Sequence, residues 1–105
     1  MNVGKLYQIN KYYWMLFPSK EKAVAAKKHG LARRIVRRQH RTAAASYLSK
    51  RLECSVSCIP EGRMFILLDQ NGIYHKAFFP DGNLGWIIVT ENSEENHFNE
   101  VKVDW

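Results

Sequence analysis

Regularly spaced turn signals in the second half of the chain constrain its fold more than any other feature. Turns are indicated at Gly62, Gly72 and Gly82, each of which follows an acidic or amide residue, and two of which also lie close to a proline. Residues of these types favour tight turns between strands. The segments that they separate are short and β-prone, which predicts four strands, over residues 54–59, 63–68, 73–79 and 84–89.

The start of the chain predicts two further strands and then a helix. Residues 3–9 alternate between apolar and polar side chains, as a half-buried strand does, and residues 11–17 are aromatic up to Pro18. Ser19 then offers a helix N-cap. Glu21 follows in the first turn, where the helix dipole favours an acidic side chain.

Residues 19–52 therefore predict a helical insertion between the second and third strands. Good helix formers dominate residues 20–29, and Gly30 fits either a C-cap or a kink within one longer helix. After the last of the four predicted strands, the chain continues as a polar tail at residues 90–105. From Phe98 onward this tail either adds an edge strand or remains loose.

The buried face of the helical insertion changes along its length. In residues 31–41 the arginines lie opposite Leu31 and Ile35 on a helical wheel. The apolar residues of the next segment lie on the arginine side of the same wheel, namely Ala45, Leu48 and Leu52. One straight helix cannot both bury and expose one face, so we predict a break near residues 40–42, with Thr42 as a candidate N-cap.

Residues 65–89 resemble the last strands of bacterial SH3-like (SH3b) barrels. The resemblance rests on Gly72 before Tyr74 and Lys76, on Asp81-Gly82, and on Gly85-Trp86-Ile87. It implies an α+β fold, a small SH3-like antiparallel β-barrel, here carrying a helical insertion at about residues 19–52. Residues 1–105 would form a single domain. The layout also resembles small cyanobacterial proteins to which no function is attached.

The helical insertion departs from an ordinary SH3b domain, and this affects what the resemblance implies about function. Many SH3b domains bind cell-wall peptides outside the membrane, whereas this N-terminus does not look like a signal peptide. No apolar run is long enough to span a membrane, and the chain is expected to be cytoplasmic. Small SH3-like barrels also support nucleic-acid and protein binding, and the fold does not choose between these activities.

Charge is distributed very unevenly along the chain. Residues 1–52 carry a formal charge of +12 and residues 53–105 carry −6. Arginine pairs with phosphate through two parallel hydrogen bonds and stacks on bases. We therefore expect a binding module without catalytic activity that binds nucleic acid, DNA or RNA, through one basic face, comprising Lys27, Lys28, Arg33, Arg34, Arg37, Arg38 and Arg41. Tyr74 and Trp86 are candidates for a secondary contact.

Other interpretations of the basic face remain open. The face can dock an acidic protein surface, it can be neutralised by the acidic half of the same chain, or it can simply be solvated. Self-association is a further alternative, in which the basic helix of one copy meets the acidic residues 91–100 of another. The aromatic residues 12–14 can stack on bases, although core packing explains most of them better.

The residues offer little for catalysis, and we expect neither an enzyme nor a bound metal or cofactor. No phosphate-binding loop or nucleophile motif is present. If residues 54–58 form a strand, Cys54 and Cys58 face one side roughly 13 Å apart, which is too far for a disulfide. Two buried, reduced thiols are the preferred interpretation. The alternative is a nucleophile–base pair of one cysteine with His75.

Overall fold

The computed structural model describes residues 1–10, 13–28, 41–90 and 97–102, with residues 41–43 described in backbone only. Over these residues the chain has an α+β fold, with a five-stranded antiparallel sheet in the order β6-β5-β4-β1-β7 and a two-stranded sheet formed by β2 and β3. The elements are β1 (Leu6–Ile9), β2 (Trp14–Leu16), α1 (Lys20–Lys28), α2 (Arg41–Leu52), β3 (Ser57–Ile59), β4 (Met64–Asn71), β5 (Tyr74–Phe78), β6 (Leu84–Ile88) and β7 (Phe98–Glu100).

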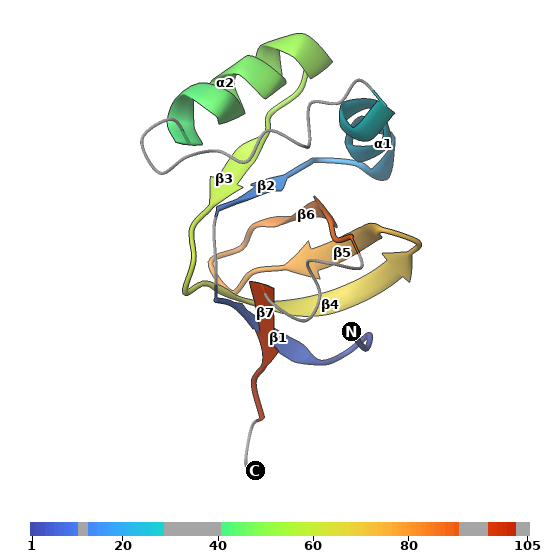
Figure 1. Cartoon of the computed structure of the whole chain (residues 1–105), viewed down its shortest axis with the longest axis vertical. Helices are drawn as coiled ribbons and strands as arrows, with labels where there is room; N and C mark the ends of the chain where they lie inside the picture. Colours follow the sequence, from blue (N-terminus) through green and yellow to red (C-terminus); the bar gives the residue numbers. More distant parts are fainter. Residues whose placement is uncertain (11–12, 29–40, 91–96, 103–105) are drawn as a thin grey trace.

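Strands β1 and β2 pair with β4 and β3 as one long, bent ribbon. Leu6 lies opposite Ile66 in the larger sheet, and Leu16 lies opposite Ser57 in the smaller one. Between the two sheets the backbone N–H of Ile9 donates to the carbonyl of Arg63 at 2.9 Å, so the ladder continues toward the bend. Helices α1 and α2 connect β2 to β3 and therefore close the far end of this ribbon (Figure 1).

A bridge between Phe17, the residue after β2, and Trp86 of β6 links the two sheets. Phe17 and Trp86 exchange two backbone hydrogen bonds of 2.8 Å each. The neighbouring Gly85 is required there, because a Cβ atom would lie 2.6 Å from the carbonyl oxygen of Phe17 and 2.7 Å from Cγ of Leu16. Glycine is the residue that permits such a close approach between backbones.

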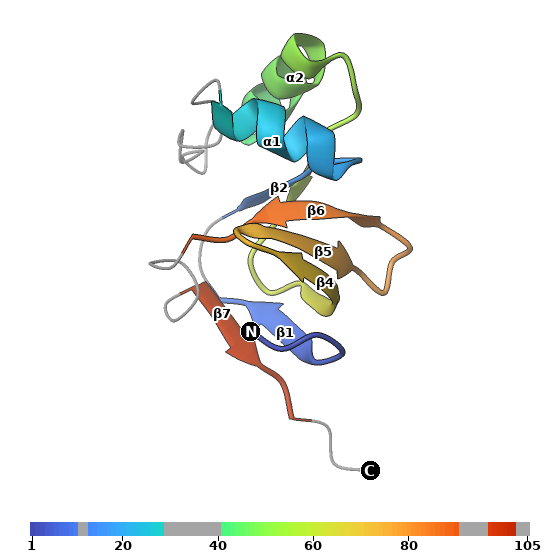
Figure 2. The same cartoon turned by 90° about the vertical axis from the view of Figure 1, so that its right-hand side faces the viewer.

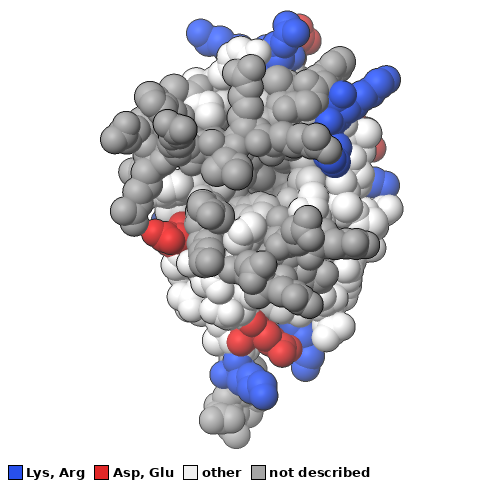
Figure 3. Space-filling view, in the orientation of Figure 1, with Lys and Arg blue, Asp and Glu red and all other residues white. Residues whose placement is uncertain are grey.

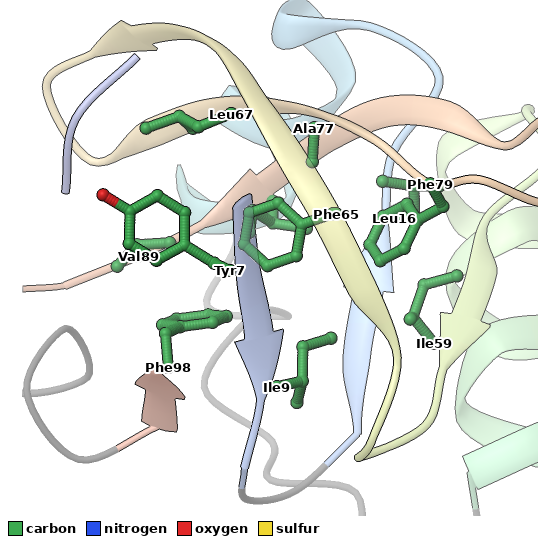
Figure 4. Packing of buried hydrophobic residues seen from close by; sticks show 11 residues of the cluster. Tyr7, Ile9, Leu16, Ile59, Phe65, Leu67, Ala77, Phe79, Val89 and Phe98 are labelled. Atoms are coloured by element: carbon green, nitrogen blue, oxygen red, sulfur yellow. The ribbon is translucent and has the colours of Figure 1, made fainter. Parts of the chain in front are cut away.

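The inner faces of both sheets share one buried core, in which aromatic rings take the central place (Figure 4). The Phe65 ring lies 5.4 Å from that of Phe79 and packs edge-on against Phe98 at 5.6 Å between ring centroids. These separations are typical of favourable aromatic pairs. The core consists of Tyr7, Ile9, Leu16, Ile59, Phe65, Leu67, Ala77, Phe79, Ile87, Val89 and Phe98.

The two helices lie at one end of the molecule beside β2 and β6, whereas β1 and β7 lie at the other end (Figure 2). We refer to α1 and α2 together as the helical layer. They bury a second cluster against the outer side of the strands, built from Phe17, Ala23, Ala26, Leu48, Leu52 and Val56. The backbone N–H of Lys22 donates to Oγ of Ser19 at 3.2 Å, so the predicted N-cap is confirmed.

The C-terminal end of α2 is held by several hydrogen bonds. Glu53 adopts a left-handed conformation with φ of 53°, and the N–H of Cys54 returns to the carbonyl of Ser49 at 3.1 Å, as in a helix-ending Schellman motif. Oγ of Ser49 accepts from the N–H of Val56 at 2.9 Å. From α1, Nζ of Lys22 donates to the carbonyl of Leu52 at 2.6 Å. The helix end is thereby joined both to α1 and to the segment that leads into β3.

Some boundaries differ from the sequence-based predictions. The third strand begins at Ser57 and not at residue 54, because the helix-ending motif occupies residues 53 and 54. Strand β4 continues past residue 68 to Asn71, because a bulge between Leu67 and Asp69 lets the ladder resume along a polar segment. Of the two alternatives for the tail, the edge strand is present as β7.

The buried face predicted for the second part of the insertion is confirmed, since Ala45, Leu48 and Leu52 are all buried. The arginine segment with which this face was contrasted lies outside the described residues, so the change of face itself stays a prediction. The predicted cap at Gly30 and most of the predicted break lie outside the described residues, as does the side chain of Thr42; α2 begins at Arg41. Within the described part of the chain, no helix is both long and apolar enough to cross a membrane.

Candidate nucleic-acid interface

The predicted basic face is only partly covered by the described residues. Lys27 and Lys28 form the last turn of α1, where Lys27 is half-buried and Lys28 is exposed. Arg41 is the first residue of α2, and its side chain lies outside the description. The remaining predicted contacts also lie outside the described residues, namely Arg33, Arg34, Arg37 and Arg38.

The exposed side of α2 carries a basic group of residues that the sequence analysis did not select. Tyr47, Lys50 and Arg51 are all exposed, whereas Leu48 on the opposite side is buried. Residues separated by three and four positions are neighbours on a helix surface. The sequence contained a signal for Tyr47, because on a helical wheel this residue falls opposite the apolar residues of α2. The predicted basic face, however, was based only on the arginine run and the two lysines before it.

The helical layer presents far more basic than acidic side chains. Among the described side chains of α1 and α2, Glu21 is the sole acid, and it lies in the first turn of α1, where the dipole explains it. In the view of Figure 3, lysine and arginine side chains lie along the top and upper right of the helical end of the molecule. The described basic residues of the layer are Lys20, Lys22, Lys27, Lys28, Lys50 and Arg51.

Lys22 differs from the other bases of the layer because its ammonium group is engaged inside the fold. Its Nζ lies 2.6 Å from the carbonyl oxygen of Leu52, at the negative end of the α2 dipole. A ligand phosphate would have to compete with that contact. We therefore exclude Lys22 from the candidate interface and keep the exposed Lys28, Lys50 and Arg51.

The two residues expected to make a secondary contact face the helical layer. Tyr74 and Trp86 are half-buried and pack against its cluster from β5 and β6. Trp86 also lies opposite Lys76 in the sheet register. Both side chains therefore contribute to the packing between the sheet and the helices.

Of the aromatic residues 12–14, Trp14 packs against the central core. Trp14 is half-buried and its ring lies 4.7 Å from that of Phe98 and 5.7 Å from that of His97. It packs against the central core and not toward the helical bases. Tyr13 is half-buried, and Tyr12 lies outside the described residues.

The cysteines and His75 lie on different sides of the sheets. Cys54 packs with the helical cluster, and Cys58 lies opposite Met15, which belongs to the same cluster. His75 alternates with outward residues of β5 and shares the inner face with Ala77. The structure thus places the members of the alternative nucleophile–base pair on different faces of the strands. Both cysteines are thiols as expected, but they are half-buried and not buried.

The described residues show no cluster of three or more histidine, cysteine or acidic side chains suited to a metal ion. What they do show is a basic helix surface next to a rigid sheet, a chemistry suited to anions.

A second surface lies on the outer face of the larger sheet. One apolar residue per strand forms a row across it: Leu84 lies opposite Phe78, Phe78 opposite Ile66, and Ile66 opposite Leu6. The N–H of Val101 donates to the carbonyl of Leu6 at 2.8 Å and extends the row beyond β7. We call these five residues the apolar row. Within the described chain they lie outside both buried clusters; Leu84 is 51% exposed and the other four are half-buried.

The geometry thus separates a basic helical layer from an apolar row on the sheet. Comparison of this chain with protein families, with curated proteins and with solved structures finds no match in any of the three.

Proposed function

We propose that this protein is a non-catalytic module that binds nucleic acid through the basic surface of the helical layer together with the arginine run of residues 31–41. The observation that carries the proposal is the excess of described bases over the single acid Glu21 on the two helices. Five of the eleven residues in the run are arginine, and none is acidic.

Physical chemistry favours phosphate as the main ligand group. A guanidinium donates two parallel hydrogen bonds to phosphate oxygens, and such charge-assisted bonds are the stronger ones. Phosphate contacts give affinity without reading sequence, so binding should depend on salt and little on base order. We further propose that the sheets form an SH3-like barrel that serves as the scaffold, and that the protein acts in the cytoplasm.

The test is fluorescence anisotropy with mixed-sequence DNA and RNA oligonucleotides over a salt series. If five arginines each neutralise one phosphate, affinity for duplex DNA should fall roughly 500-fold between 50 and 200 mM salt. A triple variant, Arg33/Arg37/Arg41→Ala, should lose most of that dependence. The matched control, Lys5/Lys76/Lys102→Ala, removes the same formal charge from the sheet region and the tail.

Two results would contradict the proposal. The wild-type protein could fail to bind either polymer at 50 mM salt. Alternatively, the two triple variants could weaken binding equally, which would mean that net charge and not the basic surface determines affinity.

The apolar row favours a second candidate function, a protein-interaction module. The residues next to the row on the sheet carry no net charge that would attract a charged partner. Asp69 lies opposite Lys76, so their charges balance, and Gln8 and Met64, which also lie opposite each other, are uncharged. The occupant we propose is the same face of a second copy, because two twisted apolar sheet faces pack well against each other. This interface differs from an acidic partner docked on the arginines.

Sedimentation equilibrium tests the second candidate. Leu84→Lys should shift a dimer toward monomer, whereas Val3→Lys, at another exposed apolar position, should not. Added salt should leave an apolar dimer intact and dissociate one held by the basic helix and acidic residues 91–100. A wild-type monomer at every protein concentration would rule out both forms of self-association.

A further inference from the structure

We infer that the exposed side of α2 binds single-stranded nucleic acid, with Tyr47 as a platform on which one base stacks. The inference rests on the proposed function and adds the class of nucleic acid to it. Among the large hydrophobic side chains that are exposed in the described chain, Tyr47 is the one aromatic residue, and it is 48% exposed. The others are Val3, Val24, Met64, Leu68 and Leu84.

The surroundings of Tyr47 suit a base and its phosphate. Lys50 and Arg51 follow at three and four positions and are exposed on the same side of the helix. Side chains of a helix lean toward its N-terminus, so these two cations lean toward the turn that holds Tyr47. Ala44, three residues before Tyr47, carries only a methyl group, and the tyrosine side chain is 48% exposed.

The helix that carries Tyr47 is a fixed support. Leu48 and Leu52 anchor its other side in the helical cluster. Its C-terminal end is bonded to α1 through Lys22 and to the chain before β3 through Ser49. A platform that is already ordered loses less conformational entropy when a ligand binds than a mobile loop does.

Stacking explains why the ligand should be single-stranded. A base inside a duplex already stacks on both faces, whereas an unpaired base offers a free face to an aromatic ring. Lysine and arginine contact phosphates in either form. The combination of one exposed ring with two flanking cations therefore adds affinity for single strands beyond what the charges provide to duplexes.

The experiment compares oligothymidylate and oligouridylate with a duplex of equal length at 50 mM salt. Tyr47→Ala should weaken binding to both single strands by about 5- to 150-fold and leave duplex binding within about twofold. Tyr47→Phe should retain the wild-type affinity, because the ring is preserved. Lys50/Arg51→Gln should weaken binding to single strands and duplex alike, since it removes two phosphate contacts.

The outcomes separate this inference from the proposal on which it rests. A wild-type protein that binds neither form overturns both. A protein that binds the duplex as tightly as single strands, and whose Tyr47→Ala variant is unchanged on all probes, overturns only the stacking role of Tyr47. Circular dichroism of each variant checks that the helix is intact, and the exposure of Tyr47 makes a folding defect unexpected.

Discussion

The sheets and the helical layer use their charged residues differently. In the sheet region Arg63 pairs with Asp81 at 3.2 Å, and Lys76 lies opposite Asp69. In the helical layer Glu21 is the one acidic residue among the described side chains. Of the described basic residues of the layer, only Lys22 is shown to donate a side-chain hydrogen bond within the fold, to the carbonyl of Leu52. This difference between the two regions is what the proposed function rests on, since exposed bases without a described acidic partner lie on the helices.

The two regions also differ in how much apolar volume they bury. The central core contains the rings of Phe65, Phe79 and Phe98, whereas the described residues of the helices contribute no aromatic ring to the buried part of their cluster, only two alanines and two leucines: Ala23, Ala26, Leu48 and Leu52. Burial of larger side chains stabilises more. The helical layer should therefore depend on the sheets for its stability, while the reverse dependence should be weaker.

The largest effect is expected from Phe65→Ala at the centre of the core. Removal of this fully buried ring should lower the free energy of unfolding by about 4 kcal/mol. Because the helices rest on the sheets, helical and aromatic circular dichroism signals should be lost together in urea. Val3→Ala at an exposed position is the control. Helical signal that outlasts the aromatic signal would show that the layer is stable without the sheet.

Gly85→Ala should have the next largest effect, because it acts where the two sheets meet. A Cβ atom there would press on the carbonyl of Phe17 and on Leu16, and the overpacking should cost about 2 kcal/mol. Trp86 fluorescence should change as its bridge to Phe17 loosens. Leu84→Ala, one residue away and exposed, provides the comparison. Equal stability of the two variants would contradict the proposed close packing.

Lys22→Met removes the hydrogen bond between the two helices and should cost about 1 kcal/mol. Lys28→Met, at an exposed position of the same helix, should change stability much less. Nucleic-acid affinity should show the opposite order, with the larger loss for Lys28→Met. Thermal melts and anisotropy titrations on the same two proteins measure both orders. The same order in both measurements would mean that Lys22 also contacts the ligand.

The smallest effect is expected for Arg63→Ala. Its ion pair with Asp81 is exposed, so stability should change by less than about 0.5 kcal/mol. Nucleic-acid affinity should stay within twofold of the wild type, whereas Arg51→Ala should lower it measurably. A larger loss from Arg63→Ala would extend the binding surface onto the sheet and remove the contrast between the two regions.

Local chemistry made the strands predictable. The turns at Gly62, Gly72 and Gly82 all have positive φ, so the residue type that marked each turn is also the one the backbone requires. The buried face of α2 was equally readable, since its apolar residues recur at helical spacing. These features depend on neighbours in sequence.

Two features were missed, one local and one that depends on a distant contact. Cys54 lies in a β-prone run, but the helix-ending bond to the nearby carbonyl of Ser49 takes that residue out of the strand. The need for glycine at position 85 arises from β2, nearly seventy residues earlier in the chain. The candidate interface was predicted only as a set of basic residues. Charge indicates that a surface attracts anions, but it does not indicate which aromatic residue lies beside the charges. The helical spacing of the apolar residues of α2 places Tyr47 on the opposite side, so this residue was within reach of the sequence pattern.

The helical layer is connected to the bent ribbon at one place. The layer leaves the ribbon after Leu16 and returns at Ser57, two residues that face each other across one ladder. Antiparallel partners lie only about 5 Å apart, so the chain leaves and rejoins the ribbon at nearly the same point. Loop-closure entropy grows slowly with length. The segment beyond Phe17 can therefore change in length at a small entropic cost, while the ladder and the bridge of Phe17 to Trp86 stay in place.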